Sequence, residues 1–245
     1  ITNRLVGSEM CIRDSLNTGL EDVAVAAVYD PEAVNLMAEA GVCLEIRIDL
    51  GGKADMPSIN KKGKPLRLKG IVKTLTNGEW IVRGPMYTGV KVSMGNTAVL
   101  EVGGIEIVIT SKHHEPWDTG VFTSVGIQPD KKRYLLLKSR IHYRAGFEQL
   151  AKNTITCDGE GVTTSDNNLL DFRKVRRPIY PLDNINEPYG SKMKRLGIAF
   201  SGGPTASEIV DCVGLAEDLG YESAWIAEGH GGDLSLIHIS EPTRR

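Results

Sequence analysis

The order of hydrophobic and polar residues at the start of the chain predicts a strand, a helix and a second strand. Residues 23–29 (VAVAAVY) form a continuous apolar run, which is typical of a strand buried on both faces. Asp30 and Pro31 supply an N-cap and a first helical residue, and Gly41 supplies the stop. Residues 43–50 (CLEIRIDL) then alternate apolar with charged side chains, as in a half-buried strand.

Strand and turn patterns dominate residues 53–110. An Asn-Gly pair at 77–78 and a Gly-Gly pair at 103–104 each separate two strand-like segments, so the sequence predicts two hairpins. Residues 90–94 (VKVSM) alternate once more between them. We therefore expect an antiparallel sheet in this part of the chain.

Strands and helices alternate in the next segment. Asp118 can cap a short helix, and residues 134–137 have the apolar character of a buried strand. We expect a helix over about 143–152 and a strand over about 154–157. Residues 158–168 (DGEGVTTSDNN) are rich in turn formers and predict a loop.

A second unit follows a polar stretch without periodicity at 184–192. An apolar strand at 195–200 precedes a capping box that starts at Thr205, and another strand-like segment lies at 223–227. This is one βαβ unit of minimal size. The fold class predicted for the whole chain is α+β: an antiparallel, strand-rich part next to an α/β part, followed by a truncated βαβ stub.

The two ends of the chain differ from the rest. Residues 1–15 show neither helical nor strand periodicity, and residues 234–245 pass from an apolar run to a polar tail. The strings SEMCIRDS and LSLIHISEPTRR resemble translated sequencing-adapter sequence. We expect both ends to be artefactual or disordered, so that Cys11 and His238 carry no function.

Composition and charge exclude several classes of protein. The chain has 245 residues, of which 41% are hydrophobic and 24% charged, and this is ordinary globular composition. Its formal charge of −2 favours neither nucleic acid nor an anionic membrane as partner. No apolar run is long enough to span a bilayer. The four cysteines contain no CxxC pair, so we expect a reducing compartment, the cytoplasm.

Two clusters could carry chemistry. His113, His114 and Glu115 suggest a metal site, but neighbours on an extended chain point to opposite faces, so we predict no metal ligands there. The second cluster, at 138–144 (KSRIHYR), lies where a buried strand leads into a helix, a position at which open α/β sheets bind ligands. An ordinary helix start with solvent-facing cations is the alternative for this cluster, and spacing alone leaves both open.

A series of motifs adds a family resemblance. In order along the chain they are DPEAV at 30–34, LGGK at 50–53, GPM at 84–86, MGNTAVLEVGGIEIVITS at 94–111, PWDTGVF at 116–122, GIQPDKKRYLLLKSRIHYRAGF at 126–147 and VRRPIYPLD at 175–183. Together they resemble the C-terminal domain of MlrC-type (microcystinase C) zinc metallopeptidases over about residues 16–183. The resemblance implies a zinc-dependent peptidase or amidohydrolase that acts on small linear peptides.

The resemblance also implies where the zinc and the substrate would lie. In that family a preceding N-terminal domain holds the zinc, so we expect zinc in the intact parent enzyme, none bound to this chain, and packing of this chain against that missing domain. Carried over to this sequence, His142 and Arg144 are the catalytic candidates, and Lys138 and Ser139 the substrate-binding ones. Gly146 stands where the family more often has Ala, which we expect to loosen the helix by up to about 1 kcal/mol.

Residues 193–233 resemble the start of luciferase-like flavin or deazaflavin monooxygenases, through RLGIAFSGG and AEDLGYESAWIAEGHGGD. One βαβ unit cannot close the barrel of such an enzyme, so we do not expect Glu228 or His230 to act here. The preferred hypothesis is a peptidase fragment, inactive alone. The alternatives are a non-catalytic domain that binds anions or peptides or acts as a scaffold, and, from the tail only, a piece of a flavin-dependent oxidoreductase.

Overall fold

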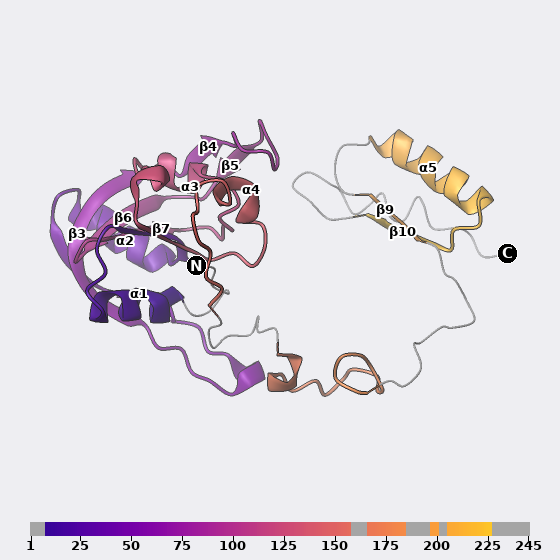
Figure 1. The fold of residues 1–245 in the computed structure, drawn as a ribbon, viewed down its shortest axis with the longest axis horizontal. Helices are drawn as coiled ribbons and strands as arrows, with labels where there is room; N and C mark the ends of the chain where they lie inside the picture. The colour runs from indigo at the N-terminus through magenta and orange to yellow at the C-terminus, as the bar shows by residue number, and fades with distance from the viewer. Residues whose placement is uncertain (1–7, 158–165, 185–196, 201–204, 227–245) are drawn as a thin grey trace. The chain divides into compact units, whose positions relative to one another are not determined.

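The computed structural model describes residues 8–157, 166–184, 197–200 and 205–226 (Figure 1). The chain divides into two compact units, Ile1–Arg176 and Arg177–Arg245. Within the described residues, no helix has both the length and the apolar character needed to cross a membrane. We describe each unit separately.

A mixed six-stranded sheet forms the centre of the first unit, with the strand order β2-β3-β6-β7-β1-β8. Strands β2, β3, β6 and β7 pair antiparallel, whereas β1 pairs parallel with both β7 and β8. The structure thus confirms the α+β class, with an antiparallel part beside a parallel part. The strand bounds are β1 (Val23–Tyr29), β2 (Glu45–Leu50), β3 (Leu66–Thr76), β6 (Thr97–Val102), β7 (Ile105–Thr110) and β8 (Tyr134–Leu137).

Strand β1 is buried on both faces, as its continuous apolar run predicts. Val23, Val25 and Val28 belong to a first hydrophobic core on one side of the sheet. The alanines at 24, 26 and 27 belong to a second core on the other side. The pairing with β7 shifts register between Val25 and Val28, which is where two successive alanines face the same core.

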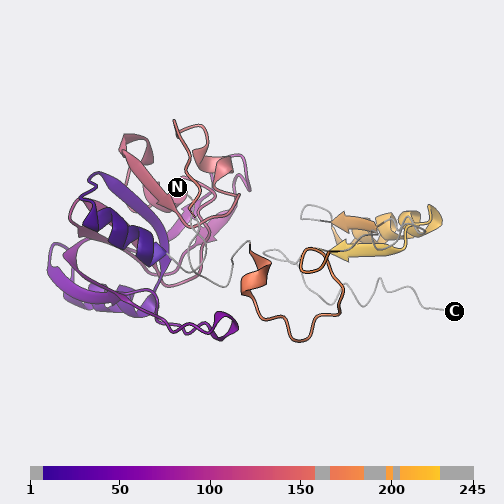
Figure 2. The same cartoon turned by 60° about the horizontal axis from the view of Figure 1, so that its bottom comes forward.

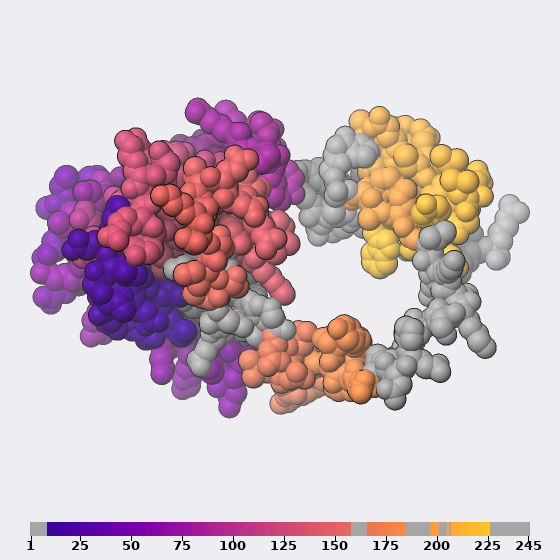
Figure 3. Space-filling view, viewed as in Figure 1, coloured from indigo at the N-terminus to yellow at the C-terminus, as the bar shows by residue number. Residues whose placement is uncertain are grey.

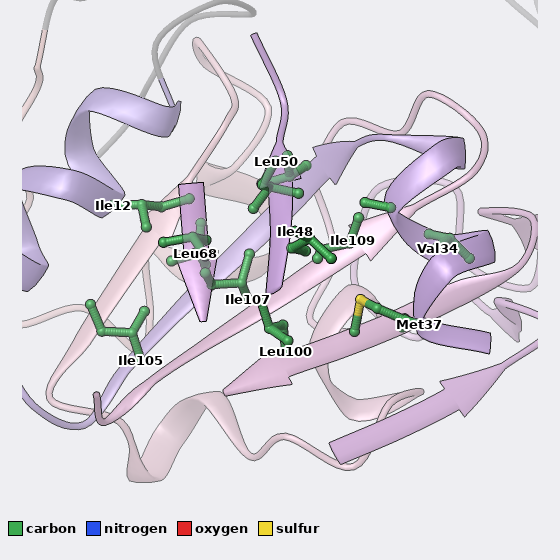
Figure 4. Packing of buried hydrophobic residues seen from close by; sticks show 14 of the residues in the cluster. Ile12, Val34, Met37, Ile48, Leu50, Leu68, Leu100, Ile105, Ile107 and Ile109 are labelled. Carbon is green, nitrogen blue, oxygen red and sulfur yellow. The ribbon is translucent and has the colours of Figure 1, made fainter. Parts of the chain in front are cut away.

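Helices α1 (Ser8–Asn17) and α2 (Pro31–Ala40) contribute to the first core. Ile12, Val34 and Met37 from these helices are fully buried with Ile107 and Ile109 of β7 (Figure 4). Full burial of each such side chain stabilises the fold by roughly 1.5–3 kcal/mol relative to exposure.

The structure differs from the sequence prediction at the start of the chain. We predicted residues 1–15 to be artefactual or disordered. Residues 8–15 are ordered, since they lie in α1 and Ile12 is completely buried, whereas an artefactual origin of the segment stays a prediction. Burial of Ile12 in the core stabilises α1, although the local pattern of apolar residues does not predict a helix there. Residues 1–7 and 234–245 lie outside the described residues.

The second core lies under two very short helices and a two-stranded ribbon. Helix α3 (Gly120–Thr123) and helix α4 (Arg144–Phe147) meet through Phe122 and Phe147, whose rings pack edge to face with centroids 5.9 Å apart. The ribbon pairs β4 (Glu79–Ile81) with β5 (Lys91–Ser93) and buries Val92 in the same core. This packing fixes α4, whose first residue, Arg144, is the last residue of the segment at 138–144.

Local signals predicted helix α2 and one hairpin correctly. The side chain of Asp30 accepts a hydrogen bond from Ala33 N at the start of α2, and Gly41 ends the helix with a φ of 93°. The Gly-Gly pair at 103–104 joins β6 and β7 in the predicted hairpin. Caps and turns are local features, so sequence alone can predict them.

The hairpin predicted around residues 77–78 is wrong. Strand β3 pairs with β2 on one edge and β6 on the other, so neither edge is left for β4. Strand β4 pairs with β5 instead. The Asn-Gly pair at 77–78 therefore turns the chain out of the main sheet instead of returning it beside β3.

The segment after β8 also has less regular structure than predicted. The helix expected over 143–152 ends at Phe147, and residues 154–157 form no strand. Residues 148–156 are all exposed, and the space-filling view shows this segment on the surface of the first unit (Figure 3). Without an apolar face against the core, a longer helix there gains no packing energy. The segment between β2 and β3, which carries a 3-10 turn η1 (Pro57–Ile59), extends away from the sheet (Figure 2).

The second unit contains the predicted βαβ arrangement. Strands β9 (Gly197–Phe200) and β10 (Ser223–Ile226) are parallel and are joined through α5 (Ala206–Asp218). The capping box at Thr205 and Glu208 is present. Another 3-10 turn, η3 (Asn167–Leu169), belongs to the first unit. Glu228, His230 and residues 185–192 of the predicted linker lie outside the described residues.

Candidate functional site

Several polar side chains gather at the carboxyl ends of β7, β1 and β8. Because these three strands are parallel, their carboxyl ends share one edge of the sheet, where α/β proteins place their ligand sites. Glu115 follows β7, Asp30 follows β1, and the segment from Lys138 to Arg144 follows β8. The predicted site residues therefore belong to this edge.

Glu115 joins two of the predicted site residues. Its Oε1 accepts a hydrogen bond from Ser139 Oγ at 2.5 Å, and its Oε2 lies 2.9 Å from His142 Nδ1. About half of the His142 side chain is exposed, at 46%, so the imidazole is held on one side and open on the other. A carboxylate on Nδ1 fixes the ring orientation of a histidine and leaves Nε2 as the second hydrogen-bonding atom.

Ser139 is the buried member of this group, with only 3% of its surface exposed. Besides donating to Glu115, its Oγ accepts a hydrogen bond from Tyr143 N at 3.0 Å. The hydroxyl thus links the loop after β7 to the start of α4. Its place in the structure suits a residue that positions the loop around a ligand.

Lys138 and Arg144 have contrasting surroundings. Lys138 is half-buried, and burial lowers the pKa of its ammonium, while the negative charge of Glu9 acts in the opposite direction. Arg144 is exposed, and a hydrogen bond with the Tyr143 side chain raises the pKa of its guanidinium. Arg144 begins a helix of only four residues, so the expected contribution of a helix dipole to anion binding is small here.

The two adjacent histidines lie in different surroundings. His113 stacks on Tyr29 with ring centroids 3.7 Å apart. The His114 ring lies against the rings of Trp80 and Trp117, with centroid distances of 5.6 Å and 4.6 Å, respectively. This is the arrangement expected for neighbours on an extended chain.

The described residues do not fit a zinc site. Among them there is no group of three or more His, Cys, Asp or Glu side chains that could hold a metal ion. Both oxygens of Glu115 already have hydrogen-bond partners in Ser139 and His142. A protein zinc site needs at least three such ligands around one point.

Asp118 is not the N-cap that its position in the sequence predicted: the N-cap of α3 is Thr119, which makes no side-chain cap hydrogen bond, and the Asp118 carboxylate bridges two backbone amides instead. It is buried, its Oδ1 accepts from Gly120 N at 2.7 Å, and its Oδ2 accepts from Gly84 N at 2.6 Å. The Trp117–Asp118 backbone also packs closely on α4, because a Cβ on Gly146 would lie 2.6 Å from Trp117 O. Gly146 therefore allows a close approach, a role that the comparison with alanine did not predict; a looser helix stays a prediction.

A network around Asp30 was not predicted beyond its first hydrogen bond. Asp30 Oδ2 accepts from Gly51 N at 2.9 Å, and Oδ1 lies 3.0 Å from Lys53 Nζ, which also reaches Glu32 at 2.9 Å. Burial lowers the pKa of Lys53, but its hydrogen bonds to Glu32 and Asp30 outweigh burial, so the net shift is upward. Three strands, β3, β6 and β7, separate β2 from β1 in the sheet, so no sequence signal indicated this contact.

With the fold and this edge of the sheet in view, comparison with known proteins assigns the class. The chain belongs to the family described as MlrC C-terminus, which matches residues 8–174. This match confirms the resemblance found in the motifs, although it begins at residue 8, earlier than the predicted residue 16.

Two relatives give the class a more particular character. Microcystinase C of Sphingomonas sp. is 24% identical over 180 residues, which are 73% of this chain and 33% of that protein. The crystal structure described as "Putative metallopeptidase", from Mesorhizobium sp. BNC1, has a TM-score of 0.65 and 26% identity, and the match covers 77% of this chain and 39% of that one. The chain is thus a peptidase-related domain that spans well under half the length of either relative.

Proposed function

We propose that this domain forms the substrate-binding wall of a zinc-dependent peptidase or amidohydrolase that acts on small linear peptides. The observation that carries the proposal is the Glu115 carboxylate, which holds Ser139 and His142 together at the carboxyl ends of parallel strands. Membership of the family and the names of the two relatives support the reaction class.

His142 and Arg144 have the chemistry that the proposal requires. An imidazole oriented by a carboxylate can move a proton or donate a hydrogen bond near neutral pH. An exposed guanidinium can bind a substrate carboxylate or stabilise the oxyanion that develops during acyl transfer. We assign His142 to proton transfer, Arg144 to the oxyanion and Lys138 to substrate binding. Ser139 was expected to bind substrate as well, but its hydroxyl is buried between Glu115 and Tyr143 N, so we assign it to positioning the loop.

We propose that zinc is held by a domain outside the matched region and that the present domain packs against it. The match covers only 39% of the metallopeptidase neighbour, which leaves most of that protein for the ligands. The domain described here would then bind peptides without hydrolysing them, in the cytoplasm. Because its residues do not fit a zinc site, no catalytic step through zinc is assigned to this chain.

Peptide binding to the purified chain tests the proposal. A linear tripeptide, titrated into the isotopically labelled chain, should shift the amide resonances of residues 138–144. His142→Ala and Arg144→Ala should each weaken binding, whereas Lys152→Ala, which removes an exposed cation beyond α4, should not. No shift in this segment, or equal binding by all variants, would contradict the proposal.

A further inference from the structure

Strand β2 forms one edge of the main sheet, at the end of the strand order opposite to β8. Leu44 O, just before the strand, accepts a hydrogen bond from Val72 N of β3 at 3.0 Å, so the carbonyl of Leu44 faces β3. Because the direction of hydrogen bonding alternates along an antiparallel strand, the N–H and C=O groups of Glu45 and Arg47 point to the open side. An edge of this kind can pair with a further strand.

The apolar side chains of β2 are less covered toward its amino end. Ile48 and Leu50 are buried in the first core (Figure 4). Ile46 is half-buried, and Leu44 is 55% exposed. Since side chains alternate between the two faces of a strand, these four residues lie on the same face. The first core therefore meets solvent at this edge of the sheet.

The charged side chains of β2 lie on the opposite face, beside cations of β3. Glu45 Oε2 lies 2.9 Å from Lys69 Nζ. Asp49 Oδ1 lies 3.2 Å from Arg67 Nε. Arg47 lies opposite Lys69 in the register, and among the residues that the structure describes these ion pairs of β2 do not include it. A carboxylate at the open edge would therefore complement a positive charge that has another beside it.

We propose that β2 pairs antiparallel with β2 of a second copy of this chain, about a two-fold axis at Ile46. In this register Glu45 of each copy lies opposite Arg47 of the other, and their outward-facing backbone groups exchange hydrogen bonds. Leu44 lies opposite Ile48 and extends the first core across the axis. Because the two-fold axis makes each contact twice, the strand is complementary to itself in charge and in apolar surface.

Neighbouring registers lack this complementarity. An axis at Arg47 would place the two arginines opposite each other, and like charges directly opposite destabilise a sheet. An axis at Ile48 would place Leu44 beyond the end of the second strand at Leu50, so its apolar surface would stay exposed. The axis at Ile46 is the one among these three that satisfies both the charges and the exposed apolar side chain.

Charge reversal tests the pairing, by sedimentation velocity of the full chain over a range of concentrations. We expect the unmodified chain to show a monomer–dimer equilibrium. Arg47→Glu and Glu45→Lys each place like charges opposite one another, so each should raise the dimer dissociation constant about tenfold or more. An equimolar mixture of the two variants should regain the dimer, because every charge then faces its opposite. Arg83→Glu, which reverses an exposed arginine after β4, is the matched control and should dimerise normally.

Both single variants should fold, so the loss of the dimer is separable from unfolding. Arg47→Glu places a carboxylate opposite Lys69, and Glu45→Lys removes one exposed ion pair. Hydrogen exchange gives an independent measure of the pairing. The amides of Glu45 and Arg47 should be protected only at concentrations at which the dimer forms, whereas the amide of Ile46, which faces β3, should be protected at all concentrations.

Three results would overturn the proposal: a chain that stays monomeric at every concentration, a dimer that neither charge reversal weakens, or a mixture of the two variants that does not regain the dimer. The proposed function does not depend on the outcome. Because β2 and β8 form opposite ends of the strand order, peptide binding by the loop after β8 should be the same in the monomer and in the dimer.

Discussion

The carboxylate of Glu115 lies 2.9 Å from Nδ1 of His142, across 27 positions of sequence. This contact joins the loop after β7 to the loop after β8. Ser139, also in the loop after β8, donates a second hydrogen bond to the same carboxylate. The buried Ser139 hydroxyl therefore helps to hold the carboxylate that orients the ring of His142.

Replacement of that hydroxyl should destabilise the domain. Ser139→Ala removes the donor to Glu115 and the acceptor for Tyr143 N, and we expect a loss of about 1–3 kcal/mol in the free energy of unfolding. Urea denaturation measures the loss. Ser93→Ala, which removes an exposed hydroxyl with one long contact to Gly95 N, should change stability by less than about 0.5 kcal/mol. Equal effects of the two changes would show that Ser139 has no special structural role.

Two glycines in helices should respond in opposite directions to alanine. Gly146→Ala places a methyl group 2.6 Å from Trp117 O, and we expect a loss of roughly 1–3 kcal/mol because backbone atoms cannot easily move away. Gly214→Ala in α5 meets nothing within 4 Å, so higher helix propensity should stabilise that helix by up to about 1 kcal/mol. Hydrogen exchange in α4 and α5 reports both effects. A Gly146→Ala variant that is more stable than the unmodified chain would refute the close approach described here.

The ion pairs of Lys132 should make stability depend on pH at the alkaline end. Lys132 Nζ lies 2.7 Å from Glu106 and 3.2 Å from Asp22. Burial lowers the pKa of Lys132, but the hydrogen bonds and charges of its partners outweigh burial and raise it above its ordinary 10.5. Because the folded state holds the proton more tightly, this stabilisation is complete below 10.5 and is lost as the pH rises through the raised value.

The measurement is urea unfolding of the unmodified chain and of Lys132→Met at several alkaline pH values. We expect the variant to be less stable by roughly 1 kcal/mol at neutral pH and the difference to shrink above pH 10.5. Lys152→Met is the control, since Lys152 is exposed and lies far along the chain from these carboxylates. A difference that is constant with pH would mean that packing, and not charge, accounts for the role of Lys132.

The sequence predicted those parts of the molecule that local rules determine. Asp30, Gly41 and the turn at 103–104 act within a few residues of themselves, so their effects follow from residue type. Helix α1 was missed because its stability comes from Ile12 in a distant core. The pairing of β4 with β5 was missed because it depends on which strand edges the rest of the sheet has already used.

The candidate site divides in the same way. The segment at 138–144 was found because a buried strand leads directly into polar residues. Glu115 was considered only as a metal ligand, since nothing in the sequence shows that residues 115 and 142 meet.

The central claim is that the loop after β8 faces the substrate in the intact enzyme. The most direct test is steady-state kinetics of an intact metallopeptidase of this family that has an arginine at the position of Arg144, before and after replacement of that arginine by alanine. The account predicts that kcat for a small linear peptide falls about 100-fold or more, as for loss of an oxyanion contact, while the melting temperature stays unchanged. An unchanged kcat, or a lost melting transition without any separable kinetic effect, would contradict it.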